Sequence, residues 1–197
     1  MKKIYLFLLT LCLVSVWSLP AAAGDDLAFV EKDGIHYTVK GKNQVYIINS
    51  FHYWRSSDIT DQNYSWLDGR DVEIPKSVYV RDGWHAIYGH QNIIGVERYA
   101  FENMTAKVNL TLPTTIKNID PYSFENATGL QSITLQEGIE SIGQYAFYGC
   151  SQLTNVDLPT TLKSIARYTF YNCFSLRNVT IPSTITTIEG SAFSNCG

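Results

Sequence analysis

The chain has 197 residues, of which 45% are hydrophobic, 17% are charged and 13% are aromatic, and its formal net charge is −3. This length holds one or two domains, and the apolar content indicates a folded chain and excludes intrinsic disorder. The sparse, slightly acidic charge argues against nucleic-acid binding and against attachment to an anionic membrane through basic residues.

Residues 1–23 are typical of a secretory signal peptide. Two lysines follow the initial methionine, residues 4–17 are almost entirely apolar, and Ala21–Ala23 supply the small side chains that signal peptidase requires. The apolar run is too short for an uncleaved membrane anchor. A lipid anchor on Cys12 is disfavoured because Leu11 stands where a small residue is needed. The sequence therefore predicts a secreted or cell-surface protein that is exported by a cleaved signal peptide, with no transmembrane segment in the mature chain.

Residues 24–95 are expected to form a small β-rich N-terminal cap. Short runs of apolar residues are separated by turn signals such as Asp33-Gly34 and Asp82-Gly83. These runs predict a three-strand meander and then a second pair of strands, over residues 27–32, 35–40, 44–48, 78–80 and 84–88.

Within this cap, residues 50–71 are polar and rich in turn residues but carry several large aromatic side chains. One interpretation is that the aromatic rings cover the apolar end of the repeat array that follows. The other is a platform for sugar rings. The candidate platform residues are Trp54, Tyr64, Trp66 and Trp84.

From residue 96 onward the sequence repeats every 23 residues. Five phenylalanines mark the period, and a tyrosine stands two residues before each of the first four: Phe101, Phe124, Phe147, Phe170 and Phe193, with Tyr99, Tyr122, Tyr145 and Tyr168. Aliphatic residues recur at further positions of each unit. This pattern indicates a solenoid, because one unit has too little apolar surface to fold alone and stacked units bury their columns together.

Each unit divides into short segments. A Leu-x-Leu segment such as residues 110–112 alternates as a strand does, and proline often follows it. Residues 116–119 predict a second extended segment, and residues 145–150 predict a helical turn that carries Phe147 inward. We expect the tyrosine column to seal the convex side beside this turn.

The segment Ile-Gly-x-Tyr-Ala-Phe-Tyr-Gly-Cys-x-x-Leu-x-x-Val-x-Leu-Pro-x-x-Leu, at residues 142–162, resembles the BspA-type leucine-rich repeat. The resemblance covers residues 94–197 closely and reaches residues 72–75 more weakly. It implies a curved array of parallel strands on a secreted or surface-attached protein, and some members of this family are adhesins for host matrix or plasma proteins. We therefore predict a right-handed leucine-rich-repeat solenoid over residues 96–197, preceded by the β-rich cap.

The last unit reaches only Gly197, before the leucine and strand positions that would complete it. We expect an incomplete last repeat whose apolar columns are open. A truncated product, a frayed last unit and an edge that pairs with another chain are the alternatives.

Cys150, Cys173 and Cys196 share one phase of the repeat. Disulfides are disfavoured because the number is odd and because equivalent positions in stacked units point their Cβ atoms in parallel. We expect a structural column of buried thiols, which replaces Met104 and Ala127 of the earlier units. Histidine spacings typical of zinc sites and the usual nucleophile or phosphate-binding motifs do not occur in the sequence. The sequence predicts a protein without cofactor, metal or catalytic residues.

The outward middle positions of the strands form the candidate ligand surface: Thr111, Thr134, Asp157 and Thr180. Such residues are either ordinary solvated strand residues or a polar face for a partner. Our leading hypothesis is an adhesin-like binding module that recognises a host matrix or plasma protein through the repeat surface. A glycan-binding accessory protein that uses the N-terminal aromatic residues, and a structural remnant without a ligand, are the alternatives.

Overall fold

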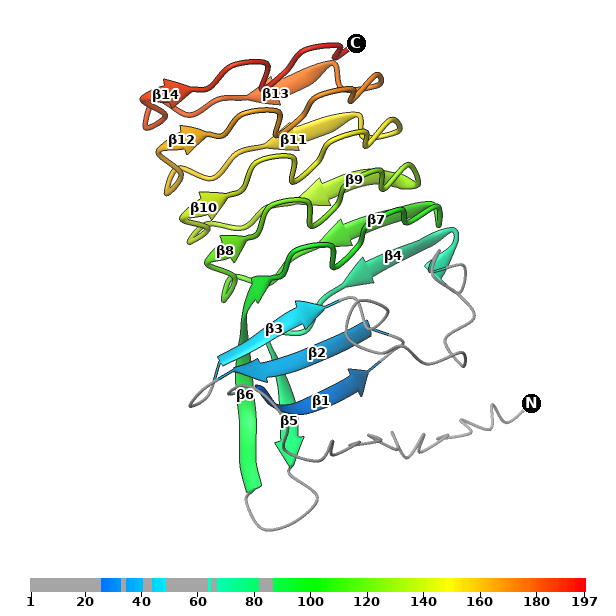
Figure 1. Ribbon diagram of the computed structural model, residues 1–197, viewed down its shortest axis with the longest axis vertical. Helices are drawn as coiled ribbons and strands as arrows, with labels where there is room; N and C mark the ends of the chain where they lie inside the picture. The colour runs from blue at the N-terminus through cyan, green and yellow to red at the C-terminus, as the bar shows by residue number, and fades with distance from the viewer. Residues whose placement is uncertain (1–25, 33–34, 41–43, 49–63, 65–66, 82–86) are drawn as a thin grey trace, which may run out of the picture.

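The computed structural model describes residues 26–32, 35–40, 44–48, 64, 67–81 and 87–197, and over these ranges it consists of strands and turns (Figure 1). The described residues contain no α-helix, and therefore none that is long and apolar enough to cross a membrane. The predicted signal peptide, Trp54, Trp66 and Trp84 lie outside the described residues. The predicted solenoid is confirmed, because coils with a 23-residue period stack along one axis (Figure 1).

One column of parallel strands contains one strand from each coil. From Asn109 onward, partners in neighbouring strands are 23 residues apart, as in the pairs Leu110–Ile133 and Val156–Val179. The column begins before residue 96, the predicted start of the array, because its first strand pairs in parallel with the second. The strands are β4 (Arg70–Glu73), β7 (Val108–Thr111), β9 (Leu130–Thr134), β11 (Asn155–Asp157) and β13 (Asn178–Thr180).

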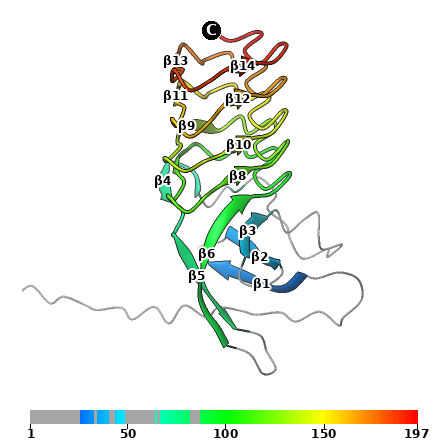
Figure 2. The same cartoon turned by 90° about the vertical axis from the view of Figure 1, so that its left-hand side faces the viewer.

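A second column of two-residue strands runs along another side of the coils. It consists of β8 (Asn118–Ile119), β10 (Ser141–Ile142), β12 (Ser164–Ile165) and β14 (Thr187–Ile188). The first two of these strands pair with each other in parallel, and so do the last two. Figure 2 shows the array from this side, with β9, β11 and β13 along one edge and the turns of the coils along the other.

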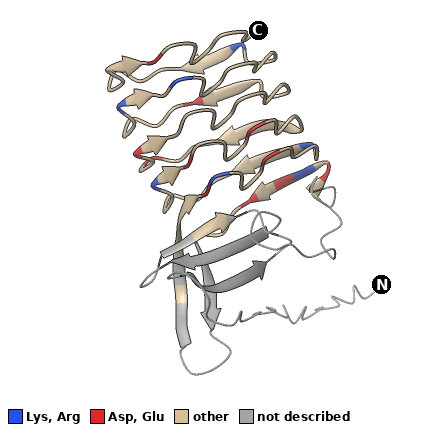
Figure 3. Cartoon of the chain, in the orientation of Figure 1, with Lys and Arg blue, Asp and Glu red and all other residues tan. Residues whose placement is uncertain are grey.

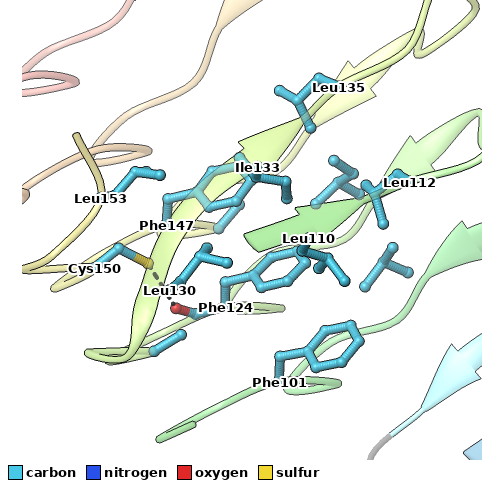
Figure 4. Close-up of a cluster of buried hydrophobic side chains, with 14 of the residues drawn as sticks. Phe101, Leu110, Leu112, Phe124, Leu130, Ile133, Leu135, Phe147, Cys150 and Leu153 are labelled. Atoms are coloured by element: carbon cyan, nitrogen blue, oxygen red, sulfur yellow. Dashed lines mark hydrogen bonds between the residues drawn. The ribbon is translucent and has the colours of Figure 1, made fainter. Parts of the chain in front are cut away.

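Phenylalanine side chains form the centre of the core. Phe101, Phe124, Phe147 and Phe170 are at most 1% exposed. Their rings stack from coil to coil, with centroids 4.9, 5.0 and 5.2 Å apart, and Figure 4 shows the first three of them. Strand residues such as Leu110 pack beside them, because alternate side chains of a strand point to opposite faces. The core therefore continues through the stack and grows with each added coil.

The segment predicted to form a helical turn, residues 145–150, is instead a series of tight turns. Tyr145 and Gly149 have positive φ angles of 59° and 71°, which a right-handed helix does not contain. The backbone N–H groups of Phe147 and Gly149 donate to carbonyl oxygens of the next coil, 2.9 and 2.8 Å away. No helix forms because these donors bond between coils. Phe147 nevertheless points inward, as predicted.

The predicted N-terminal meander is present. β1 (Asp26–Lys32), β2 (Ile35–Lys40) and β3 (Gln44–Ile48) pair antiparallel in this order. β5 (Ser77–Arg81) forms an antiparallel pair with the longer β6 (Ile87–Val96). β3 also pairs in parallel with β6, and β6 pairs with β8. One sheet therefore runs from the meander into the second strand column of the solenoid (Figure 1).

Candidate functional site

The outer face of the first strand column, here called the strand face, carries two rows of polar side chains. The middle row contains the predicted ligand residues Thr111, Thr134, Asp157 and Thr180, preceded by Glu73 of β4. The other row contains Asp71, Asn109, Ser132, Asn155 and Asn178. The structure therefore brings the four predicted strand residues together in one row. Thr111 is half-buried and the other three are exposed.

The second row is held in place by hydrogen bonds between coils. Asn109 Nδ2 donates to Asp71 Oδ1 at 2.8 Å, and Ser132 Oγ donates to Asn109 Oδ1 at 2.7 Å. Asn178 Nδ2 donates to Asn155 Oδ1 at 3.2 Å. These bonds occupy many of the hydrogen-bond donors and acceptors of this row and hold its side chains in place. The sequence shows polar residues two positions before the middle row, but it does not predict the bonds between them.

The side chains of the middle row are the ones on the strand face that are available to bind a partner. Within the described part of the chain, the side chains of Thr134, Asp157 and Thr180 make no hydrogen bond to protein atoms. Their hydroxyl and carboxylate groups are therefore free to bind a partner. Charge is concentrated at the β4 end, and Asp157 is the one charged residue on β7, β9, β11 and β13 (Figure 3).

Of the predicted aromatic platform, the described residues include Tyr64 alone. This residue is 6% exposed, its hydroxyl donates to the Ala100 carbonyl, and its ring centroid lies 5.6 Å from that of Phe101. Burial raises the pKa of the Tyr64 hydroxyl above its usual range. The Tyr64 ring therefore lies buried against the first phenylalanine of the core stack, whereas a sugar platform needs an exposed ring face.

The three cysteines of the repeat are free thiols in one column. Cys150 and Cys173 are 0% exposed and Cys196 is half-buried. The Sγ atoms of the first two lie 3.2 and 3.1 Å from the carbonyl oxygens of Phe124 and Phe147, to which they donate (Figure 4 shows the first). Burial raises the pKa of both thiols. Among the described residues, no group of three or more His, Cys, Asp or Glu side chains is placed to hold a metal ion.

We expect the protein to lose stability in alkali partly through these thiols. Above pH ~8.5, the ordinary thiol pKa, cysteines of the unfolded chain ionise while Cys150 and Cys173 stay protonated in the folded state. The folded state then binds more protons, so the free energy of unfolding falls as pH rises. The Cys150→Ala/Cys173→Ala variant, which copies Ala127 of an earlier coil, should show a shallower fall in urea unfolding between pH 7 and pH 10. Equal slopes for both proteins would contradict this.

A row of half-buried tyrosines belongs to the turns that follow the second strand column. The rings of Tyr122, Tyr145 and Tyr168 stack with centroids 4.9 Å apart. Sequence reasoning missed a second pair beside them, Tyr148 and Tyr171, whose rings stack at 5.4 Å. The 23-residue spacing of these two tyrosines could have revealed the pair from the sequence. The turn side of the array therefore presents a broader aromatic surface than the single predicted column.

The family described as "BspA type Leucine rich repeat region" matches residues 72–197 in six copies. This match starts at β4, where the first strand column begins. No curated protein matches the chain significantly.

Solved structures with a similar fold come from several bacteria. A leucine-rich cell surface protein of Faecalibacterium prausnitzii A2-165 is 21% identical, with a TM-score of 0.56 over 88% of this chain and 48% of that protein. A leucine-rich repeat protein of Bacteroides capillosus ATCC 29799 is 18% identical, with a TM-score of 0.57 over 82% of this chain and 99% of that one. The pneumococcal vaccine antigen PcpA is 21% identical, with a TM-score of 0.62 over 85% of this chain and 42% of the antigen. This chain thus spans about half the length of the first of these proteins. At such identities the likeness concerns the fold.

Proposed function

This chain belongs to the BspA-type leucine-rich-repeat family, and from that premise we propose that it is a secreted or cell-surface binding module that recognises a protein ligand through its strand face. The ligand class we favour is a host matrix or plasma protein, so that the module acts in adhesion. Two solved structures of similar fold support a surface location, since one is described as a cell surface protein and another as a vaccine antigen.

The observation that carries this proposal is the middle row of the strand face. Its exposed side chains are short and polar, they have no hydrogen-bond partner within the described structure, and strand pairing keeps them in line. The neighbouring row is fixed by its own hydrogen bonds. Binding a partner costs little side-chain entropy on this surface, because its side chains are short.

A non-enzymatic role accords with this arrangement. Leucine-rich repeats are scaffolds that present an extended surface, and repeat surfaces generally serve in binding. The buried thiols have raised pKa values, which disfavours the reactive thiolate form.

Large cationic side chains on the strand face should weaken ligand binding. The Thr134→Arg/Thr180→Arg variant places two guanidinium groups in the middle row, where they would block a complementary surface. Binding to immobilised fibronectin, laminin, collagen and fibrinogen, measured by surface plasmon resonance, should weaken by about tenfold or more for the protein that the unaltered chain recognises.

The matched control is Ser141→Arg/Thr187→Arg, which adds the same charge at exposed positions of β10 and β14. It should bind as the unaltered chain does. Equal losses in both variants would reject the strand face as the binding surface. If none of the four proteins binds, and retention on polysaccharide depends on Trp54 and Trp66, the glycan-binding alternative replaces this proposal.

A further inference from the structure

Four tyrosines from two adjacent coils form a compact cluster, here called the tyrosine block: Tyr145, Tyr148, Tyr168 and Tyr171. Along the array, the rings stack in two pairs with centroids 4.9 and 5.4 Å apart. Across each coil, the rings are tilted or edge-on at 5.8 and 5.5 Å. All four side chains are half-buried, so part of each ring reaches the surface.

The backbone at this cluster is one that tyrosine rarely adopts. Tyr145 and Tyr168 have φ angles of 59° and 60°, in the left-handed region that favours glycine and asparagine. Four residues later the chain enters the same region again, and there it uses Gly149 and Asn172 as expected. Tyrosine therefore occupies the first position despite its conformational cost. Ring stacking offsets part of this cost but does not require the hydroxyl groups.

The groups that the tyrosine block presents outward favour a negatively charged partner. Stacking covers the inner ring faces of the two pairs, and the ring edges carry the positive side of the aromatic quadrupole while the hydroxyl groups can donate. Within the described structure, these four hydroxyls have no hydrogen-bond partner.

Arg167 adds a positive charge at the edge of the block. Its guanidinium lies 5.8 Å from the Tyr168 ring centroid, and no carboxylate in the described part of the chain lies within ion-pair distance of it. The nearby Glu189 carboxylate accepts from the Arg167 backbone N–H at 3.0 Å. The exposed guanidinium therefore keeps its paired N–H donors for an external carboxylate.

The neighbouring coils differ at the same positions. Glu102 and Glu125 stand where the block has Tyr148 and Tyr171. The pKa of Glu125 is raised by burial and by the charge of Glu102. These two carboxylates disfavour an anionic ligand on the first two coils, where Arg98 holds the position equivalent to Arg167 and lies over the Tyr99 and Tyr122 rings.

We propose that the tyrosine block and Arg167 form a second docking surface, separate from the strand face, for an acidic peptide segment of a partner protein. A carboxylate of the segment pairs with the guanidinium, and neighbouring carboxylates or carbonyls accept from the tyrosine hydroxyls. A peptide with carboxylates uses Arg167 and the hydroxyl donors together, whereas a neutral sugar ring would use aromatic faces, of which the inner ones are covered.

Fluorescence anisotropy with a fluorescein-labelled hexaglutamate peptide tests this proposal on the full chain. The chain has a net charge of −3, so general attraction does not favour the peptide. We expect saturable binding at low salt and none to hexaglutamine. Arg167→Gln should weaken binding about tenfold, and Tyr171→Phe, which keeps the ring, should weaken it about threefold.

The matched control is Arg177→Gln, which removes an exposed charge next to β13, outside the block. It should change affinity less than twofold. Equal losses for Arg167→Gln and Arg177→Gln would overturn the proposal, as would the absence of hexaglutamate binding at about 1 mM. Tighter binding of heparin, lost in the same Arg167→Gln variant, would assign the surface to a sulfated glycan and reject the peptide.

Discussion

Replacing Phe147 by alanine is expected to lower the free energy of unfolding by about 3–5 kcal/mol. The ring is fully buried and stacks on Phe124 and Phe170, with centroids 5.0 and 5.2 Å away. Removing it opens a cavity between two coils and ends both stacking contacts, each worth about 0.5–1.5 kcal/mol beyond buried area. Urea unfolding followed by circular dichroism measures the change.

The control for this variant is Phe174→Ala. Phe174 belongs to the next coil, but its side chain is 60% exposed. Its loss should change stability by less than about 0.5 kcal/mol. Equal destabilisation by the two variants would mean that the phenylalanine stack contributes no more than an exposed ring, contrary to the core described above.

Replacing Gly129 by alanine should destabilise the protein by about 3 kcal/mol, although only one methyl group is added. A Cβ atom at this position would overlap the carbonyl oxygens of Thr105 and Ala106 in the preceding coil. These are backbone atoms, so no side chain can rotate away, and the two coils would have to separate. The φ angle of Gly129 lies outside the left-handed region, and the expected effect is therefore steric. Thermal and urea unfolding test it.

Gly190→Ala is the matched substitution without a clash. The nearest atom to a Cβ atom at Gly190 is Arg167 Nε, at 3.9 Å, which is ordinary contact. Stability should stay unchanged or rise by up to about 1 kcal/mol, because alanine restricts the unfolded chain. If Gly129→Ala is as stable as Gly190→Ala, the coils are packed less tightly than this structure requires.

The stacking of the coils could be predicted because its signal recurs along the sequence. The five phenylalanines at equal spacing identify the inward position, and the Leu-x-Leu segments identify the strands. One unit alone would be ambiguous between a short strand and a turn, but repetition removes that ambiguity. For the same reason, the outward row at Thr134 and Thr180 could be placed from the amino-acid sequence alone.

The features that escaped prediction depend on contacts that only the folded chain defines. The pattern at residues 145–150 predicts a helical turn because tyrosine gives no signal for a left-handed backbone. The parallel pairing of β3 with β6 joins segments separated by nearly fifty residues, and neither strand pattern specifies its partner. The sequence leaves Tyr64 open between a capping role and a ligand role, because a single aromatic ring has no periodicity that would reveal its burial.

The equal length of the coils also limits how such a protein can change over evolutionary time. Gain or loss of a 23-residue segment leaves the phenylalanine, cysteine and tyrosine columns aligned, since every column has the same period. An indel of any other length inside a coil shifts the later columns out of line, unless a surface turn accommodates it. Duplication and deletion of whole coils are therefore the tolerated steps. They would lengthen or shorten the strand face without redesigning the core.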